Sequence, residues 1–228
     1  MGDLVATARL ARVTGALYLL LAGLGMLGPL TLESLVVPGD GGATAENIAR
    51  SQALFDWSLG AWLVIVAVDI AVSVTLYLLL APAGRRLSIL AAAFRLVYST
   101  ALGALLAHLF TARGLLAHPA ADGPQATAGA LTALETFSAG FLVALVFFGV
   151  HLVLLGTLLH RSRYTPRIFG LLLVAAGCGY VVDSIASLMA DGYGGPLAAI
   201  LLTPAVVGEV GLAVWLLVKG VSVQRGRP

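Results

Sequence analysis

The feature that most constrains this chain is a series of long apolar segments separated by short polar stretches. Six segments are long enough and apolar enough to cross a membrane: residues 9–32, 53–80, 87–110, 130–160, 167–189 and 197–218. A helix needs about 20 mostly apolar residues to cross a hydrocarbon core of about 30 Å. Because lipid offers no partners for backbone N–H and C=O groups, each segment is expected to be helical. The sequence therefore predicts an all-α, polytopic transmembrane bundle of six spanning helices, forming a single domain over residues 1–228.

Composition excludes the other broad classes of protein. Only 11% of the 228 residues are charged and 60% are apolar, whereas a soluble domain carries about 25% charged residues. A soluble enzyme and a nucleic-acid binder with a basic face are both excluded, and the expected partner is the lipid bilayer. The single cysteine, Cys178, excludes an internal disulfide framework and a cysteine-based zinc site.

The basic residues predict the orientation of the chain. Ten of the thirteen Lys and Arg residues fall on one predicted side: Arg9, Arg12, Arg85, Arg86, Arg161, Arg163, Arg167, Lys219, Arg225 and Arg227. Arg50 and Arg113 fall on the other side, and Arg95 lies inside a span. The positive-inside rule then predicts that both termini are cytoplasmic and that the protein resides in the inner (plasma) membrane. The excess of Arg over Lys, with abundant Ala and Gly, suggests a bacterial source.

Several glycine patterns resemble motifs without having their context. Residues 23–28 match the G-x-G-x-x-G pattern, but they lie inside an apolar span rather than between a strand and a helix. Small residues in spans let helix backbones approach closely, so close helix packing is predicted here. The same prediction applies to a further set of glycines: Gly149, Gly156, Gly170, Gly177, Gly179, Gly208 and Gly211. The chain contains no H-E-x-x-H, C-x-x-C, G-x-S-x-G or P-loop sequence.

Ionisable residues from four different spans lie at one predicted depth. Measured from the cytoplasmic end at 1.5 Å per residue, Asp69 lies about 16 Å deep, Arg95 about 12 Å, His151 about 14 Å and Glu209 about 15 Å. Asp183 lies higher, at about 24 Å. Charged groups in the bilayer core are costly, so they face the bundle interior and pair with one another. The predicted partner of Arg95 is Asp69, Glu209 or both.

The charges in this layer do not balance. The buried ionisable residues include three acids but one permanent cation, Arg95, because His151 is a cation only when protonated. Burying the excess negative charge is unfavourable, so a carboxyl is expected to hold a proton, or a cation to occupy the site. The predicted ligand-binding residues are Asp69, Arg95, His151, Asp183 and Glu209. An equally weighted alternative is a structural staple that holds four helices in register.

The most elaborate loop covers residues 35–48 and contains a Pro38-Gly39 pair typical of a type II turn. Thr44 is predicted to cap a helix over residues 45–52, with Glu46 in its first turn. The loop is interpreted either as a lid over the bundle or, more simply, as an ordered interfacial hairpin.

Three functions fit these features. The first is a membrane-embedded binding or transport module for a proton, a cation or a small polar solute. The second is an intramembrane enzyme that uses His151 with a carboxylate as an acid–base pair or as metal ligands, although no nucleophile is evident. The third is a non-catalytic membrane scaffold. No cofactor, catalytic residue, metal site or oligomeric state follows from the sequence.

Seven blocks of the chain, in order, carry a resemblance to a known family: RVTGALYLL (12–20), LVVPGDGGATAENIARSQALF (35–55), AAAFRLV (91–97), LVFFGVHLVLLG (145–156), RSRYTPRIFGLLL (161–173), GYVVDS (179–184) and PAVVGEVGLAVWLLVKG (204–220). On these blocks the sequence resembles a bacterial multi-pass membrane family known as domain of unknown function 4386. It implies a small multi-pass membrane protein and supplies no catalytic residues.

Overall fold

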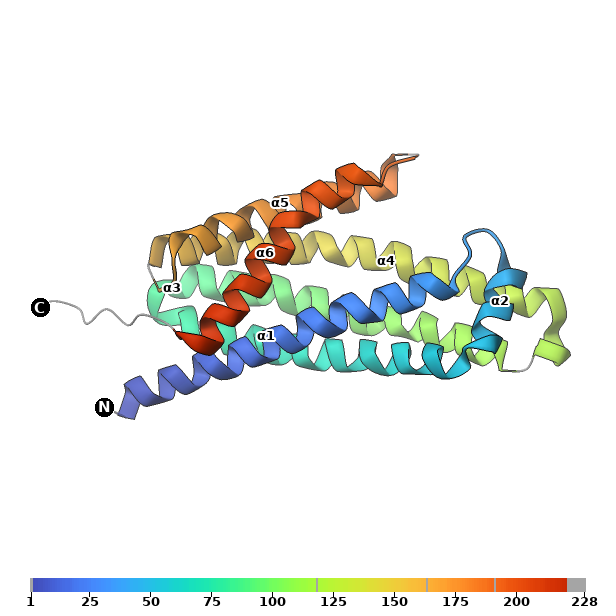
Figure 1. Cartoon of the computed structure of the whole chain (residues 1–228), viewed down its shortest axis with the longest axis horizontal. Helices are drawn as coiled ribbons and strands as arrows, with labels where there is room; N and C mark the ends of the chain where they lie inside the picture. Colours follow the sequence, from blue (N-terminus) through green and yellow to red (C-terminus); the bar gives the residue numbers. More distant parts are fainter. Residues whose placement is uncertain (1, 118, 163, 191, 221–228) are drawn as a thin grey trace, which may run out of the picture. The chain divides into compact units, whose positions relative to one another are not determined.

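The structure is a computed structural model that describes residues 2–117, 119–162, 164–190 and 192–220, with side chains described outside 2–6 and 119–122 (Figure 1). Its elements are α1 (Gly2–Leu35), α2 (Gly41–Arg50), α3 (Gln52–Leu116), α4 (Pro119–Ser162), α5 (Arg167–Met189) and α6 (Pro196–Val218). The all-α prediction is confirmed, since the described residues contain no strand. Five of these helices, all except α2, are long and apolar enough to cross a membrane.

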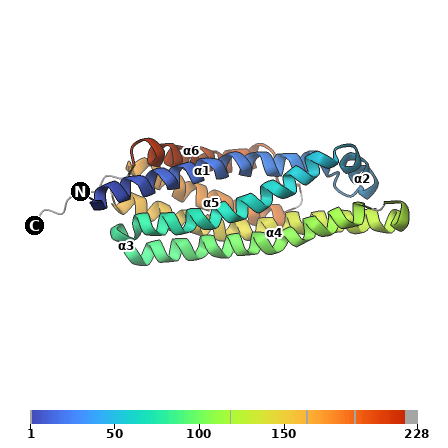
Figure 2. The ribbon, with the colours of Figure 1, turned by 90° about the horizontal axis from the view of Figure 1, so that it is seen from below.

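The longest helix, α3, is a hairpin of two antiparallel halves. Its 65 residues would measure about 98 Å if straight, roughly three times the hydrocarbon thickness. The helix instead breaks at Gly84, where φ is 176° and ψ is 83°, between the predicted spans 53–80 and 87–110. Figure 2 shows α3 turning back on itself, and hydrogen bonds from Ser73 to Ala92 O (3.1 Å) and from Ser88 to Tyr77 O (3.2 Å) join the halves. Each half therefore corresponds to one of the six predicted segments.

The chain divides into two compact units that share its long helices. Unit 1 comprises Met1–Ala22, Val68–Ser99 and Leu142–Pro228, and unit 2 comprises Gly23–Ala67 and Thr100–Phe141. The single domain and the cytoplasmic termini stay predictions. Three of the basic residues that support that orientation, Arg163, Arg225 and Arg227, lie outside the described residues.

Unit 1 is packed through glycines, as predicted. A Cβ added at Gly156 of α4 would lie 2.6 Å from the carbonyl oxygen of Gly170 in α5, and one added at Gly149 would lie 2.7 Å from that of Gly177. α1 meets α6 in the same way, because a Cβ at Gly15 would lie 2.6 Å from Ala213 O. These backbones are close enough that any side chain at the glycine positions would collide with the neighbouring helix.

Unit 2 contradicts the packing prediction for the glycines of α1. A Cβ added at Gly23 or Gly25 would meet no atom within 4 Å, and one at Gly28 would meet only side chains, at 3.6 Å or more. The interior of this unit instead contains a cluster of aromatic rings among leucine, isoleucine and alanine side chains. Trp62 packs edge-to-face against Phe137 and Phe141, with ring centroids 5.2 Å apart in both pairs. Close helix contact therefore depends on which face of the helix the glycines occupy, and a G-x-G-x-x-G pattern does not specify that face.

The loop before α2 confirms the predicted turn and corrects the predicted cap. Gly39 has a φ of 75°, and the Asp40 amide donates to Val37 O at 3.1 Å, as a type II turn requires. Asp40, not Thr44, caps the helix: its carboxylate accepts from the Ala43 amide at 2.9 Å. The Thr44 hydroxyl instead accepts from the Val37 amide at 2.9 Å, which favours the ordered hairpin over a lid.

The change of cap also moves Glu46 out of the first turn of α2. It lies one turn before Arg50 and forms an exposed ion pair with it, with 2.5 Å between Oε1 and Nη2. The predicted interaction of Glu46 with the helix N-terminus is therefore wrong, because the helix begins four residues earlier than predicted.

Candidate functional site

The candidate site is a buried polar network in unit 1, and three helices contribute its predicted residues. Asp69 and Arg95 lie on the two halves of α3, His151 lies on α4, and Glu209 lies on α6. Asp69, Arg95 and His151 are buried, whereas Glu209 is partly exposed. Each comes from a segment that is otherwise almost wholly apolar, so the network is the main polar feature of these helices.

Arg95 and Asp69 form the centre of the network. The guanidinium donates from Nε to Asp69 Oδ1 at 3.0 Å and from Nη2 to the same oxygen at 2.5 Å. The Ser99 hydroxyl, one turn after Arg95, donates to the second carboxylate oxygen, Oδ2. Asp69 is thus the direct partner predicted for Arg95, and its negative charge is balanced locally.

His151 is held as a neutral ring by its two neighbours. Its Nδ1 lies 2.8 Å from the carbonyl oxygen of Ala91, and its Nε2 lies 3.1 Å from Arg95 Nη1. A carbonyl oxygen can only accept and a guanidinium can only donate. Nδ1 therefore carries the hydrogen and Nε2 accepts, so His151 adds no charge, although the sequence allowed it to be a second cation.

Tyr18 of α1 connects the central pair to Glu209. Arg95 Nη1 donates to the Tyr18 hydroxyl oxygen at 3.2 Å, and the same hydroxyl donates to Glu209 Oε2 at 3.3 Å. The Tyr180 side chain of α5 also interacts with the Glu209 carboxylate. Glu209 is therefore joined to Arg95 only through a phenol.

Aromatic rings enclose the guanidinium. The carbon Cζ of Arg95 lies 4.9 Å from the centre of the Tyr18 ring and 5.3 Å from that of Phe148. Both distances fall within the range of favourable cation–π interaction. The positive charge is thus stabilised by two ring faces as well as by Asp69.

The charges of the network can now be assigned. Arg95 and Asp69 cancel, and His151 is neutral in this arrangement. Within the part of the chain that the structure describes, Glu209 forms no ion pair, and its hydrogen-bond partner Tyr18 is uncharged. Within the network, the uncompensated negative charge is therefore located on this one partly exposed carboxyl group, while the third acid of the predicted layer, Asp183, lies outside the network.

Asp183 does not join this network. It is buried on α5 and accepts a hydrogen bond of 2.8 Å from the hydroxyl of Tyr193, which lies in the loop between α5 and α6. Partial loss of hydration and this hydrogen bond raise the pKa of Tyr193, so the phenol keeps the proton that it donates. Asp183 was predicted to lie higher than the other four residues but was grouped with them as a ligand-binding residue, and the structure places it apart from their network.

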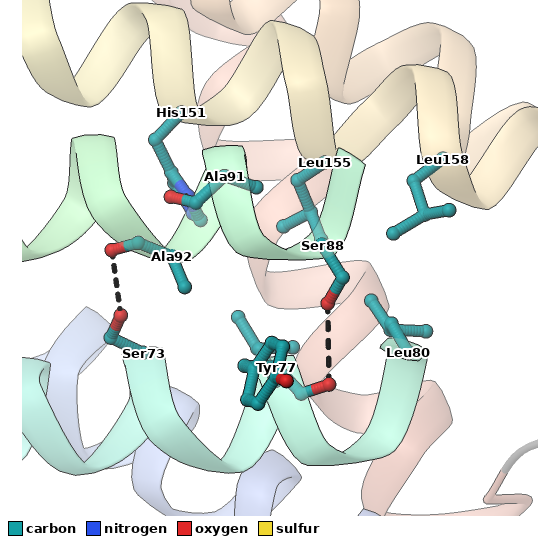
Figure 3. Close-up of a pocket in the computed structure, with 10 residues that line it drawn as sticks. Ser73, Tyr77, Leu80, Ser88, Ala91, Ala92, His151, Leu155 and Leu158 are labelled. Atoms are coloured by element: carbon teal, nitrogen blue, oxygen red, sulfur yellow. Dashed lines mark hydrogen bonds between the residues drawn. The ribbon is translucent and has the colours of Figure 1, made fainter. Parts of the chain in front are cut away.

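A small cavity adjoins His151 on the side of the Gly84 turn (Figure 3). It has a volume of about 10 Å³, close to the minimum that a single water molecule needs. Ser73, Ser88 and His151 line it together with leucine and alanine side chains. Figure 3 shows the two serine hydroxyls bonded to carbonyl oxygens across the α3 hairpin. The space admits water and excludes any larger solute.

Metal binding finds no support in the side-chain geometry. Among the described residues, no group of three or more His, Cys, Asp or Glu side chains is placed to hold a metal ion. The two ring nitrogens of His151 are both engaged in hydrogen bonds. Metal ligation by His151 would require the loss of one of them.

Sequence reasoning missed Tyr18 and Tyr180, which bind the Glu209 carboxylate. Tyr18 lies nine residues after Arg9, about 14 Å from the predicted cytoplasmic end, and so at the depth of the charged layer. A count that included phenols as well as ionisable acids and bases would have found it.

The apolar helices and the buried charge network together define a multi-pass membrane protein. The chain belongs to the family described as Domain of unknown function (DUF4386), whose model matches residues 13–220, a range that contains the whole network. It is 32% identical over 162 residues to an "Uncharacterized protein" of the archaeon Archaeoglobus fulgidus, an alignment covering 71% of this chain and 82% of that relative. No solved structure gives a significant match. The predicted family is confirmed, and it extends to an archaeon, while the bacterial source of this chain stays a prediction.

Proposed function

We propose that this protein is a membrane-embedded proton-binding and transport module in which Glu209 takes up and releases the proton. The observation that carries the proposal is the unequal pairing of the two acids in the network. Asp69 is buried against a guanidinium, whereas Glu209 is partly exposed and is bound by the uncharged hydroxyl of Tyr18. A carboxylate in an apolar bundle without a cation at contact distance gains most from binding a proton.

The orientation of Tyr18 favours a proton over a metal cation. The lone pairs of its hydroxyl face Arg95 Nη1, so its hydrogen points at Glu209. A metal ion at the carboxylate would meet this hydrogen and the positive guanidinium behind it. A proton adds to the carboxylate without displacing either group. The other carboxylate of the network, Asp69, is already bonded to Arg95 and Ser99, so it does not complete a cation shell.

The Arg95–Asp69 pair provides a fixed charge next to the titrating group. Its two residues come from opposite halves of α3, so the pair also staples the hairpin. The guanidinium of Arg95 polarises the Tyr18 hydroxyl, which donates its hydrogen bond to Glu209. This interaction stabilises the ionised form of Glu209 enough for the proton to leave. We therefore assign the two acids different roles: Asp69, with Arg95, forms a structural ion pair, and Glu209 is the acid that titrates.

The enzymatic alternative receives less support from the geometry. A general base needs a free lone pair, but His151 Nε2 accepts from Arg95 and Nδ1 donates to Ala91 O. No side chain of the network is a nucleophile beside a free base. We place the protein in the plasma membrane with both termini cytoplasmic, on the distribution of its basic residues.

The test is proton flux into liposomes that contain the purified protein and a pH-sensitive dye. Flux above that of empty liposomes is expected for the wild type and is lost in Glu209→Gln. Tyr18→Phe removes the hydrogen bond to the carboxylate and should slow the flux by about tenfold, the effect of one lost hydrogen bond to a charged group. Glu33→Gln, which changes an exposed acid of α1, is the matched control. Flux equal to that of empty liposomes, or unchanged by Glu209→Gln, contradicts the proposal and favours a scaffold.

A further inference from the structure

A second concave site lies in unit 2, between α2 and the two ends of α3. Its volume is about 420 Å³, within the range of small-molecule pockets, which span about 300–1,000 Å³. Because α3 doubles back, its first and last turns meet, and both contribute to the lining. The pocket therefore lies at the ends of membrane-length helices, where lipid headgroups and water meet.

Two of the α2 residues that line the pocket are alanines, whose side chains are too short to fill it. Ala45 and Ala49 lie one helical turn apart on its wall, and their side chains leave the space unfilled. The base is formed by Ile48 and Phe55, which are buried. An apolar base with an open wall suits a ligand that has a short carbon chain.

Charged groups of both signs line the pocket. Arg113 donates from Nε and Nη2 to the two carboxylate oxygens of Asp56, at 2.6 and 3.1 Å. A guanidinium has five N–H groups, so this pair leaves three of them for a ligand. Glu46 also lines the pocket, and it binds Arg50 through Oε1, so its second oxygen takes no part in that ion pair.

We propose that this pocket binds phosphoethanolamine, either as a free solute or as the headgroup of a phospholipid. The phosphate would accept from the three free N–H groups of Arg113, because guanidinium forks match phosphate oxygens geometrically. The ammonium would donate to Glu46 and Asp56, and the carbon chain would lie against Ala45 and Ala49. The space beyond the headgroup can hold the glycerol backbone of a lipid.

The experiment measures binding to the full-length protein. Phosphoethanolamine, ethanolamine and inorganic phosphate are titrated separately into detergent-solubilised protein by calorimetry. In parallel, protein in nanodiscs of phosphatidylethanolamine or phosphatidylglycerol is examined by native mass spectrometry for retained lipid. Binding of free phosphoethanolamine indicates a solute site, and retention of phosphatidylethanolamine alone indicates a lipid site. Both results support the proposal, provided that ethanolamine and phosphate bind about tenfold or more weakly, as the loss of one charged contact predicts.

Two variants tie the binding to the pocket. Ala49→Leu fills the space and leaves every charge in place, and Arg113→Gln removes the phosphate donor. Each should weaken binding by about tenfold or more, whereas the exposed Ala53→Leu, outside the lining, should change it by less than about twofold. Circular dichroism checks folding, and Arg113→Gln decides the test if Ala49→Leu does not fold. The proposal is overturned if the wild type retains neither ligand, if phosphatidylglycerol is retained equally, or if a folded pocket variant binds as the wild type does.

Discussion

Helix α3 carries two Arg–Asp pairs, one in each unit, and the pairs differ strongly in their exposure to solvent. Arg95 and Asp69 in unit 1 have side-chain exposures of 1% and 3%, whereas Arg113 and Asp56 in unit 2 have exposures of 45% and 37%. Each pair joins the outgoing half of the helix to the returning half. The same residue types therefore hold the same hairpin together in two different environments.

The difference shows what burial demands of an ion pair. The Asp69 carboxylate has donors on both oxygens, and Arg95 uses Nε, Nη1 and Nη2, because no water can satisfy a group left free. The Asp56–Arg113 pair makes two hydrogen bonds with each other and leaves the rest to solvent or a ligand. The buried pair therefore bonds to protein groups through both carboxylate oxygens and all three guanidinium nitrogens, whereas the exposed pair leaves N–H groups available to a ligand.

The largest expected effect is the loss of the buried cation. Arg95→Met leaves Asp69 as an uncompensated buried charge, and the free energy of unfolding should fall by about 3–5 kcal/mol. Reversible unfolding in mixed detergent micelles, followed by circular dichroism, measures the change. A loss no greater than that of Arg113→Met would show that burial does not distinguish the two pairs.

Removing both members of the buried pair sharpens the same comparison. The double variant Arg95→Met/Asp69→Leu has no unpaired charge, so it should recover most of the stability that Arg95→Met loses. The unfolding free energies of the wild type, both single variants and the double variant give the coupling energy. If the losses of the single variants simply add, the two residues do not form a unit.

The glycines extend the comparison to packing. Gly156→Ala in unit 1 should destabilise the protein by about 1–3 kcal/mol, because the added Cβ would lie 2.6 Å from Gly170 O. Gly25→Ala in unit 2 meets no atom within 4 Å and should stabilise by about 0.5–1 kcal/mol through helix propensity. The same unfolding assay compares them. Equal effects of the two substitutions would contradict the packing difference.

The smallest effect is expected from the exposed pair. Arg113→Gln removes its cation, but water replaces the lost contacts, and exposed ion pairs contribute little to stability. The unfolding transition should match that of the wild type within experimental error. A loss comparable to that of Arg95→Met would mean that unit 2 depends on its ion pair as strongly as unit 1 does.

Much of this fold is predictable because the lipid environment requires apolar spanning segments to be helical. Long apolar runs must be helical in lipid, and the Pro82 and Gly84 residues between two such runs disfavour a continuous helix, so the segments and the α3 reversal follow from the sequence. Depth along a helix is also fixed by the rise per residue. That is why Asp69, Arg95 and His151 could be grouped before their contacts were known.

The sequence does not show how each helix is rotated about its own axis, or which of two competing side chains makes a given contact. The face that each helix turns to its neighbours decides that Gly15 packs tightly while Gly23 and Gly25 do not. Two acceptors, Asp40 and Thr44, compete for the start of α2, and the choice depends on the backbone conformation of Asp40. Whether Glu209 meets Arg95 directly depends on Tyr18, whose phenol occupies the space between them.

Infrared difference spectroscopy across a pH change identifies the carboxyl group that takes up the proton. In the wild type a protonated-carboxyl band should arise as the pH is lowered, and the same band should arise in Asp183→Asn, because Asp183 lies outside the network. In folded Glu209→Gln the band should be missing. Persistence of the band in Glu209→Gln would contradict the account, because another acid would then hold the proton.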